Sequence, residues 1–283
     1  MSYRLLDSGH GRKLEDVGGV IVTRQAPTAI WAPSLSRHEW DKAEGVHHRS
    51  EKGGGRWEWL SGPKFSWNVT LGANTFLVKP TPFGHVGLFA EQEEQWRWIT
   101  ESVEQFVERE QRAPEVLNLF AYTGGSTLAA ARGGAKVTHV DAAKGVVDWG
   151  RHNAELNELQ DAPIRWMVDD CISFVEREVR RGKNYDGLIL DPPTFGRGKK
   201  NEVWTIDKNL GPLLLSLQKL VNSNPAFLLL SCHSPGYTPI ALEQLADDYF
   251  GRADSQSEGG EMSIPHENSS RRLPSGFFTR RRR

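Results

Sequence analysis

The stretch Leu117–Gly125, LNLFAYTGG, decides the fold of this 283-residue chain. Its apolar first half predicts a buried strand, and Gly124 with Gly125 predicts a tight turn into a helix. A second apolar run, 136–140, follows that helix and ends on Asp141. A strand, a glycine pair, a helix and a strand that closes on an acid are typical of a nucleotide-binding βαβ unit.

The alternation of strand and helix continues along the chain and predicts an α/β fold with a mostly parallel, Rossmann-like sheet of seven strands. The strands are almost continuously apolar, which is typical of a parallel sheet covered by helices on both faces. An antiparallel edge pair over 260–264 and 274–280 completes the sheet. The parallel strands are predicted over 116–120, 136–140, 164–168, 187–191 and 226–231, and the helices over 91–112, 125–132, 143–158, 171–181, 205–222 and 239–249.

Residues 1–90 differ from the rest and predict a small β-rich domain, which leaves 91–283 for the α/β domain. Their apolar pieces are short, rich in β-branched and aromatic residues, and separated by Gly, Pro and Asn. Seven of the ten tryptophans lie at or before Trp98. Large rings fill a thin β core, which is the role we favour, although exposed rings can also stack on nucleic-acid bases.

The composition narrows the class of protein. A hydrophobic fraction of 38% and a charged fraction of 25% are ordinary for a globular protein with a core. The only cysteines are Cys171 and Cys232, so no disulfide framework is implied and a reducing compartment is expected. No run resembles a signal peptide or a membrane span. We therefore expect a cytoplasmic protein with no membrane partner.

The charge is unevenly distributed. The chain carries a net charge of −1, which argues against a generally basic nucleic-acid binder. Residues 271–283 hold six arginines and no acid, which leaves −7 for residues 1–270. Such a basic end either contacts phosphate or forms a solvated tail, and both interpretations stay open.

A ligand site is expected where the first three strands end. Glycine lets the backbone approach a ligand, and a helix start can bind a carboxylate; the pattern is not G-x-G-x-x-G, so a pyrophosphate fits less well. Asp141 is placed to accept both ribose hydroxyls, and Asp170 the exocyclic amine of adenine, with Asp169 as a competitor for that role. One acid at a strand end is more often a helix N-cap. Acids after three consecutive strands, however, indicate a nucleoside ligand.

The fourth strand ends in Asp191, Pro192, Pro193, Thr194 and Phe195. The two prolines stiffen the loop and remove two N–H donors, which leaves carbonyl groups and one carboxylate. Such a surface accepts hydrogen bonds from a planar nitrogenous substrate, on which Phe195 is placed to stack. The alternative is a purely structural role, in which the loop is a rigid turn and the phenylalanine is buried. A dehydrogenase does not use this loop, so the pattern indicates a methyl donor rather than a hydride donor.

Two further groups complete the predicted reaction site. Cys232 follows the fifth apolar run, close to Asp191 in the expected sheet; it is either a nucleophile that attacks a pyrimidine at C6 or an inert, half-buried thiol. His233 is adjacent and is expected to point the opposite way. The loop 196–201, GRGKKN, is a candidate substrate-binding loop through Arg197, Lys199 and Lys200, unless it is simply an exposed loop.

With these motifs in place, the chain resembles the class I S-adenosylmethionine-dependent methyltransferases, and more narrowly the bacterial group that includes the ribosomal RNA large-subunit methyltransferases. That group carries L-N-L-F-x-Y-T-G, an acid after the second strand and D-P-P-[ST]-F, and the resemblance covers roughly residues 84–209. It implies that residues 191–195 face the target base. It also implies that the cofactor, S-adenosylmethionine, is held by Phe120, Gly124, Asp141 and Asp170, and we add Ala121, Tyr122 and Gly125 of the same loop. The segment 85–96 contains GLFAEQ, which looks like a hairpin of that group; it either brings Phe89 and Gln92 near the cofactor or is only a domain junction, as its pattern alone indicates.

The chain departs from the group at several positions. His85 stands where the group's K-T-G-F-F-L-D-Q-R hairpin has lysine, and the closing arginine is missing. The first 90 residues do not look like the RNA-binding modules commonly attached to these enzymes. The Ser-Cys-x-Ser pattern over 231–234 resembles the cysteine motif of cytosine-5 members, some relatives of which lack that cysteine.

The predicted activity is methyl transfer from S-adenosylmethionine to a nucleobase, in ribosomal RNA above all and at cytosine C5 if Cys232 is a nucleophile. No metal is expected, and the oligomeric state is left open. The first alternative keeps the cofactor and changes the substrate to a protein or small molecule. The net charge of −7 over residues 1–270 favours this alternative. The second is an inactive methyltransferase fold that serves as an RNA-binding or assembly factor.

Overall fold

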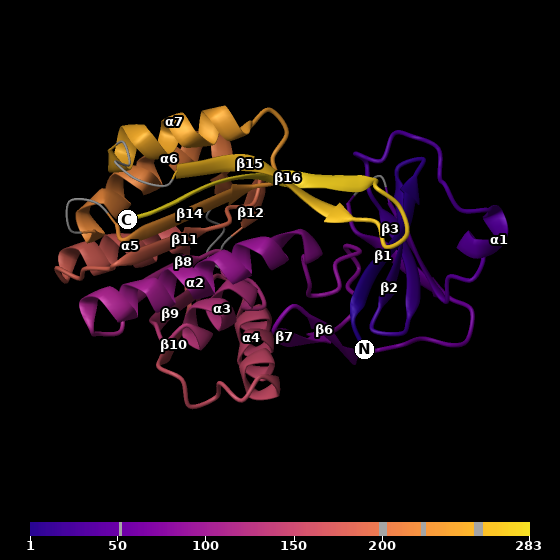
Figure 1. The fold of residues 1–283 in the computed structure, drawn as a ribbon, viewed down its shortest axis with the longest axis horizontal. Helices are drawn as coiled ribbons and strands as arrows, with labels where there is room; N and C mark the ends of the chain where they lie inside the picture. The colour runs from indigo at the N-terminus through magenta and orange to yellow at the C-terminus, as the bar shows by residue number, and fades with distance from the viewer. Residues whose placement is uncertain (51–52, 198–202, 222–224, 252–256) are drawn as a thin grey trace. The chain divides into compact units, whose positions relative to one another are not determined.

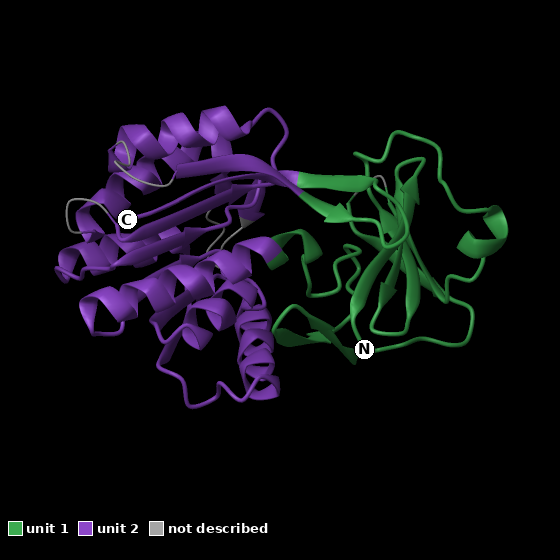
Figure 2. Cartoon of the chain, viewed as in Figure 1, with its two compact units in different colours: residues 1–93, 263–275 green, residues 94–262, 276–283 purple. Residues whose placement is uncertain are grey.

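The chain folds into two compact units in the computed structural model, which describes residues 1–50, 53–197, 203–221, 225–251 and 257–283. One unit comprises residues 1–93 and 263–275, and the other comprises residues 94–262 and 276–283 (Figures 1 and 2). Residues 263–275, the turn end of a C-terminal strand pair, therefore group with the N-terminal residues. A local sequence pattern does not indicate this grouping, because it depends on which residues meet in three dimensions.

The second unit is built on a seven-stranded sheet in the order β10-β9-β8-β11-β14-β16-β15. The first five strands in this order, from β10 to β14, run parallel to one another, and β16 pairs antiparallel with β14. This confirms the predicted mostly parallel sheet and its edge pair. The strands are β8 (Glu115–Leu119), β9 (Lys136–Asp141), β10 (Ile164–Val168), β11 (Gly187–Leu190), β14 (Phe227–Cys232), β15 (Ser257–Pro265) and β16 (Arg272–Arg282).

Helices cover both faces of this sheet: α2, α3 and α4 lie on one side, and α5, α6 and α7 on the other (Figure 1). Each begins within two residues of its predicted start, since capping and apolar spacing are local signals. A short helix, η2 (Gln218–Leu220), continues α6. Before α6, the short strands β12 (Phe195–Arg197) and β13 (Val203–Thr205) pair antiparallel. The helices are α2 (Glu93–Glu110), α3 (Gly125–Arg132), α4 (Lys144–Leu156), α5 (Cys171–Arg180), α6 (Ile206–Leu217) and α7 (Pro239–Phe250).

Alternate residues of the central strands form the main core on the α5–α7 side. Leu188 and Leu190 of β11 and Leu228 and Leu230 of β14 belong to one buried cluster with the apolar residues of these helices. Because side chains alternate along a strand, the intervening residues face α2, α3 and α4. This division into two faces decides which residues meet at the strand ends.

The arginine-rich end is part of the sheet. Arg280 and Arg281 lie in β16 and are buried. The Arg280 guanidinium contacts the carboxylate of Glu258 and donates to Gln95 Oε1 at 3.0 Å. Arg281 donates to the carbonyl of Ala246 in the last turns of α7, where a cation is favoured, and burial lowers its pKa. Both interpretations of the basic end, phosphate contact and a solvated tail, are therefore wrong for these two residues.

The first unit is built mainly from strands. A five-stranded sheet in the order β1-β2-β3-β4-β5 is antiparallel except between β3 and β4, and β6 pairs with β7 in a separate hairpin. Two short helices, α1 (Arg37–Trp40) and η1 (Ala90–Gln92), complete it. The strands are β1 (Tyr3–Gly9), β2 (Arg12–Val17), β3 (Ile21–Gln25), β4 (Gly45–Arg49), β5 (Gly55–Trp59), β6 (Trp67–Leu71) and β7 (Asn74–Val78).

Three tryptophans of this unit pack against one another. The rings of Trp57 and Trp59 stack with centroids 5.4 Å apart, and Trp67 meets Trp59 edge to face at 6.3 Å. The indole nitrogens of Trp57 and Trp67 donate to the carbonyls of Thr81 and Val17. Partly buried rings with satisfied N–H groups have the packing role that we favoured for them from the sequence.

A buried charge network ties β1, β2 and β3 together. Glu15 is fully buried and its carboxylate accepts hydrogen bonds from the Tyr3 hydroxyl at 2.7 Å and from Arg24 Nε at 2.6 Å. Lys13 Nζ lies 2.9 Å from the same carboxylate. Burial raises the pKa of Glu15, but Arg24 and Lys13 outweigh it and hold that pKa at about 2. The network therefore requires the ionised carboxylate.

Glu15→Gln should lower the free energy of unfolding of the first unit by about 3 kcal/mol, because it leaves buried cations without their counter-charge. In the wild type, the Glu15 contribution should be complete above its unfolded pKa near 4.5 and be lost as the pH falls toward about 2. Urea denaturation read by hydrogen exchange in peptides of β1–β3 measures both effects. Glu39→Gln, at an exposed pair with Lys42, is the control and should leave unfolding unchanged.

Within the ranges described above, no helix is long and apolar enough to cross a membrane. Over those ranges, no group of three or more His, Cys, Asp or Glu side chains is arranged to hold a metal ion.

Candidate active site

The parallel register brings four residues at or just after strand ends to the same end of the sheet. Leu119 at the end of β8 is aligned with Val140 of β9 and with Leu190 of β11, and Leu190 is aligned with Leu230 of β14. The chain leaves β8 toward β9 and later returns to β11 on the other side of β8, which creates a switch point where such sheets bind ligands. The residues that follow the four aligned positions are Phe120, Asp141, Asp191 and Ser231.

The loop after β8 has an unusual backbone. Phe120, Tyr122 and Gly124 have φ values of +57°, +49° and +92°. Positive φ is uncommon for residues other than glycine, and such strain gathers at ligand sites where the surrounding structure enforces it. The Ala121 amide donates to Val140 and the Gly124 amide to Ala121, which hold the loop in this shape.

Glycine is required at the two positions of this loop for different structural reasons. Gly124 needs its positive φ, and a Cβ there would lie 3.6 Å from the Gly150 Cα, in ordinary contact. A Cβ on Gly125 would lie 2.4 Å from the Trp96 ring of α2, so Gly125 permits helix packing. No side chain caps α3, which begins at Gly125, so its first amides can serve a ligand carboxylate.

Asp141 joins the loops after β8 and β9. Its Oδ2 accepts the amide of Tyr122 at 3.0 Å, and its Oδ1 accepts the amide of Ala143 at 3.0 Å. Burial raises the pKa of Asp141, and these two amides oppose that rise. The carboxylate is thus fixed in one orientation in a partly dry site, beside the strained loop.

The two acids after β10 have local partners. Asp170 is the N-cap of α5 and accepts the amide of Ser173 at 2.9 Å through Oδ1, whereas Asp169 forms an ion pair with Arg177. The N-cap that we considered as the alternative for Asp170 is therefore present. A capping carboxylate keeps a second oxygen, so its contact with adenine stays a prediction.

The loop after β11 is joined to the end of β14 and to the loop that follows β14. Asp191 Oδ1 accepts the Ser231 hydroxyl at 2.7 Å, and the hydroxyls of Thr194 and Ser234 are 2.7 Å apart. Pro192 is buried, while Phe195 is 54% exposed and begins β12. The buried-phenylalanine alternative is therefore wrong, because more than half of the Phe195 side chain is exposed.

Trp204, which sequence reasoning missed, lies between the two predicted sites. Its indole nitrogen donates to the Pro193 carbonyl at 2.7 Å, and its ring centroid is 4.7 Å from that of Phe120. The side chain therefore links the loop after β8 to the loop after β11. The only sequence signal was a single tryptophan just before the helix that follows the basic loop.

Cys232 points away from Asp191. It is fully buried and belongs to the core cluster on the α5–α7 side of the sheet. Its sulfur accepts the Ser234 amide at 3.4 Å, and burial raises the pKa of the thiol. Alternation along β14 explains this: Ser231 shares the face of Asp191, so the next residue points to the other face. These features describe a packed thiol, and its nucleophilic role stays a prediction.

The remaining predicted residues lie elsewhere. Arg197 ends β12, and Lys199 and Lys200 lie outside the described residues. Phe89 and Gln92 belong to the first unit, where Phe89 precedes η1 and Gln92 is buried at its end. The roles proposed for these five residues stay predictions.

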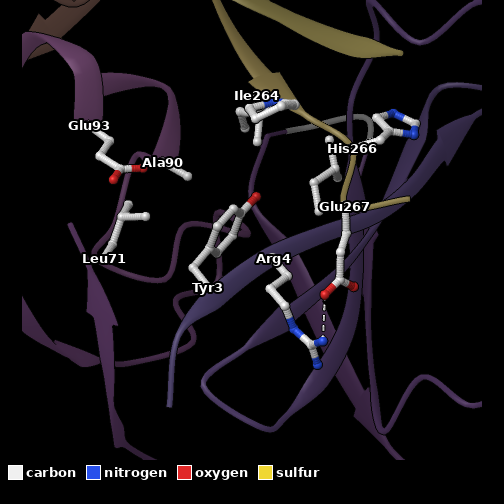
Figure 3. A pocket seen from close by; sticks show the side chains of 10 residues that line it. Tyr3, Arg4, Leu71, Ala90, Glu93, Ile264, His266 and Glu267 are labelled. Carbon is white, nitrogen blue, oxygen red and sulfur yellow. Dashed lines mark hydrogen bonds and ion pairs between the residues drawn. The ribbon is translucent and has the colours of Figure 1, made fainter. Parts of the chain in front are cut away.

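The first unit contains a pocket of about 200 Å³ (Figure 3). Tyr3, Arg4, Glu93, His266 and Glu267 surround it together with apolar residues. Its polar groups are largely engaged: Arg4 pairs with Glu267 at 2.6 Å, and the His266 ring lies 2.8 Å from the Ser8 hydroxyl. Among the residues that the structure describes, none of those predicted for the methyl-transfer site lines this pocket.

A sequence model described as S-adenosylmethionine-dependent methyltransferase matches residues 17–246, most of the chain. The chain belongs to this family. This methyltransferase is also 35% identical to an S-adenosylmethionine-dependent methyltransferase from Agrobacterium tumefaciens, whose crystal structure superposes with a TM-score of 0.91 over 99% of this chain and 90% of that chain. A methyltransferase structure in complex with SAH, 20% identical, shares the fold with a TM-score of 0.69 over 95% of this chain and 71% of that one.

Curated relatives of the methyltransferase include ribosomal RNA large subunit methyltransferases K/L. The one from Syntrophotalea carbinolica is 35% identical over 56% of this chain and 21% of its own length, and the one from Colwellia psychrerythraea is 28% identical over 61% and 23%. The chain thus matches less than a quarter of the length of these relatives.

The loops fit the cofactor of the family, S-adenosylmethionine. The positive φ of Gly124, the uncapped start of α3 and the oriented carboxylate of Asp141 provide a side-chain-free backbone, amide donors and an acceptor. These are the groups that an amino-acid carboxylate and a ribose require. The assignment of single residues to parts of the cofactor is carried forward as a proposal.

Proposed function

We propose that this enzyme transfers a methyl group from S-adenosylmethionine to a nucleobase of RNA, with ribosomal RNA as the substrate in the cytoplasm. The observation that carries the proposal is the oriented Asp191 carboxylate at the switch point, followed four residues later in the same loop by the exposed Phe195 ring. A carboxylate and an aromatic face suit a planar base that must be hydrogen-bonded and stacked. The names of the curated relatives support the same substrate class.

Each part of the site has a defined task under this proposal. The cofactor supplies a methyl group on a sulfonium, which is already a good leaving group. The loop after β8, Asp141 and Asp170 hold and orient the cofactor. Asp191, stiffened by the following prolines, orients the base and accepts its proton, and Phe195 stacks on the ring. Most of the rate then comes from alignment and exclusion of water.

The target atom depends on Cys232. Methylation of cytosine at C5 requires a thiolate that attacks C6, but this thiol is buried in the core and its pKa is raised. Asp191 lies at the strand end, about one third exposed. We therefore propose a base nitrogen as the methyl acceptor and keep cytosine C5 as the second candidate.

Cys232→Ala should retain at least about one third of the methyl-transfer rate if nitrogen is the acceptor, because the side chain then contributes only packing. The variant should unfold at a lower temperature, since it leaves a small cavity beside α6 and α7. Transfer of labelled methyl to RNA and thermal denaturation measure the two effects. Abolished transfer in a folded variant would instead establish the C5 mechanism.

The direct test is mass spectrometry of nucleosides after ribosomal RNA that lacks its modifications is incubated with the enzyme and a deuterated methyl donor. We expect one labelled methylnucleoside, absent from reactions with Asp191→Ala. A protein or small metabolite remains the alternative substrate, because residues 1–270 carry a net charge of −7 and because Arg280 and Arg281 form hydrogen bonds within the second unit. Label in protein or in low-mass products, with none in RNA, would establish it.

A further inference from the structure

Two side chains from the end of β14 meet the same oxygen of Asp191. The Ser231 hydroxyl donates to Asp191 Oδ1 at 2.7 Å, and His233 Nε2 lies 3.5 Å from that oxygen. The side chains of Asp191 and His233 are 31% and 32% exposed, so the cluster lies at the mouth of the site. Neither Ser231 nor His233 was among the residues that the resemblance assigns.

The geometry of the sheet explains why these two residues reach Asp191. Leu190 is aligned with Leu230, so Asp191 and Ser231 follow at the same level and face the same side. His233 is two residues after Ser231 and returns to that side, whereas Cys232 points into the core. The alternation that removes the thiol from the site therefore brings the imidazole to it.

The imidazole is also confined on its other side. Gly276 of β16 has a φ of +126°, and a Cβ at this position would lie 2.8 Å from His233 Nδ1 and 2.9 Å from the Cys232 carbonyl. The glycine thus lets β16 pass close to the ring. His233 is held between a strand and the Asp191 carboxylate.

We propose that Ser231 and His233 are positioning residues that hold the Asp191 carboxylate in the rotamer needed by the methyl acceptor. This inference rests on the role proposed above for Asp191 in methyl transfer. A carboxylate without such partners rotates among several orientations, and partners that fix a reacting group support rate rather than substrate binding. Contacts through Oδ1 orient Oδ2 at the same time, because the carboxylate is planar.

The rates of matched variants test this proposal. His233→Leu and Ser231→Ala should each lower kcat for RNA methylation by about 10–100-fold, the usual effect of losing an orienting partner. His233→Gln and Ser231→Thr keep a donor and should stay within roughly 5-fold of the wild type. The KM for RNA and the affinity for S-adenosylmethionine should change little. Equal losses in His233→Gln and His233→Leu would overturn the proposal.

A double variant separates positioning from general damage. If His233 acts through Asp191, then Asp191→Ala combined with His233→Leu should be no slower than Asp191→Ala alone, because groups that act as a unit are not additive. A double variant slower by the full product of the two losses would contradict the proposal. Thermal denaturation of each variant shows that the comparison is made between folded proteins.

One readout does not depend on the substrate. In nuclear magnetic resonance spectra of the full chain with nitrogen-labelled histidine, the ring resonances of His233 should change in Asp191→Asn and not in Asp148→Asn, an exposed acid of α4. Unchanged resonances in Asp191→Asn would exclude the contact and overturn the inference. If RNA is not methylated but the resonances change, the proposed substrate fails while the coupling of His233 to Asp191 stands.

Discussion

Asp191→Ala should lower the rate of methyl transfer to RNA by about 10²–10⁴-fold, the range typical of a lost acid–base or orienting group. The side chain is held at the switch point by Ser231 and faces the edge where the cofactor loops also end. Under the proposed roles Asp191 orients the base and does not bind the cofactor, so the dissociation constant for S-adenosylmethionine should stay within about 3-fold of the wild type. Single-turnover kinetics and calorimetry measure the two quantities separately.

The same strand offers a matched control for this experiment. Asp186 precedes β11 at its opposite end, where it pairs with Arg112 at 2.7 Å and accepts the amide of Glu115. Asp186→Asn should affect stability and leave the rate of methyl transfer unchanged. If Asp191→Ala were as active as the wild type, the carboxylate would have no part in the chemistry. The hypothesis of a methyltransferase fold that serves as an RNA-binding or assembly factor would then gain weight.

Asp141→Ala should weaken the binding of S-adenosylmethionine by about 10²–10³-fold. The carboxylate is proposed to accept the ribose hydroxyls, and two hydrogen bonds to a charged group contribute about 3–4 kcal/mol together. The variant also leaves the amides of Tyr122 and Ala143 without their acceptor, which loosens the loop after β8. Calorimetric titration of the full chain measures this loss.

The pH dependence of binding provides a second check on Asp141. Burial raises the pKa of this carboxyl group, and the ionised form is the better acceptor. Affinity should therefore be full at neutral pH and begin to fall at a higher pH than an ordinary aspartate would cause. Asp148→Asn on α4, at an exposed pair with Lys144, should bind like the wild type. Unchanged affinity in Asp141→Ala would remove this residue from the cofactor site.

Local patterns were sufficient for the architecture of the second unit. Each of the five predicted parallel strands is present within one residue of its predicted bounds, and α3 occupies its predicted range of 125–132. The predicted strands are 116–120, 136–140, 164–168, 187–191 and 226–231. These elements depend on periodicity, glycines and caps, all of which act over a few residues. The family resemblance rested on the same loops, since strand order makes their ends converge.

The contacts between side chains within the candidate site were harder to predict from the sequence. Cys232 was expected near Asp191 because both follow apolar runs, but a shift of one residue along a strand reverses the face of every side chain. The register, which the sequence did not reveal, places Ser231 beside Asp191 and turns Cys232 into the core. Trp204 was missed for a related reason, since its partners Phe120 and Pro193 are distant in sequence.

By itself, the sequence determined the class of fold, the order of the elements, the family and the edge of the sheet that carries the chemistry, because these follow from short-range patterns. Only the tertiary structure decided which side chains share that edge. It placed His233 and Ser231 with Asp191, enclosed Cys232, and built Arg280 and Arg281 into β16 instead of leaving them in a basic tail. Those outcomes depend on strand register and on contacts between distant segments, which no local pattern encodes.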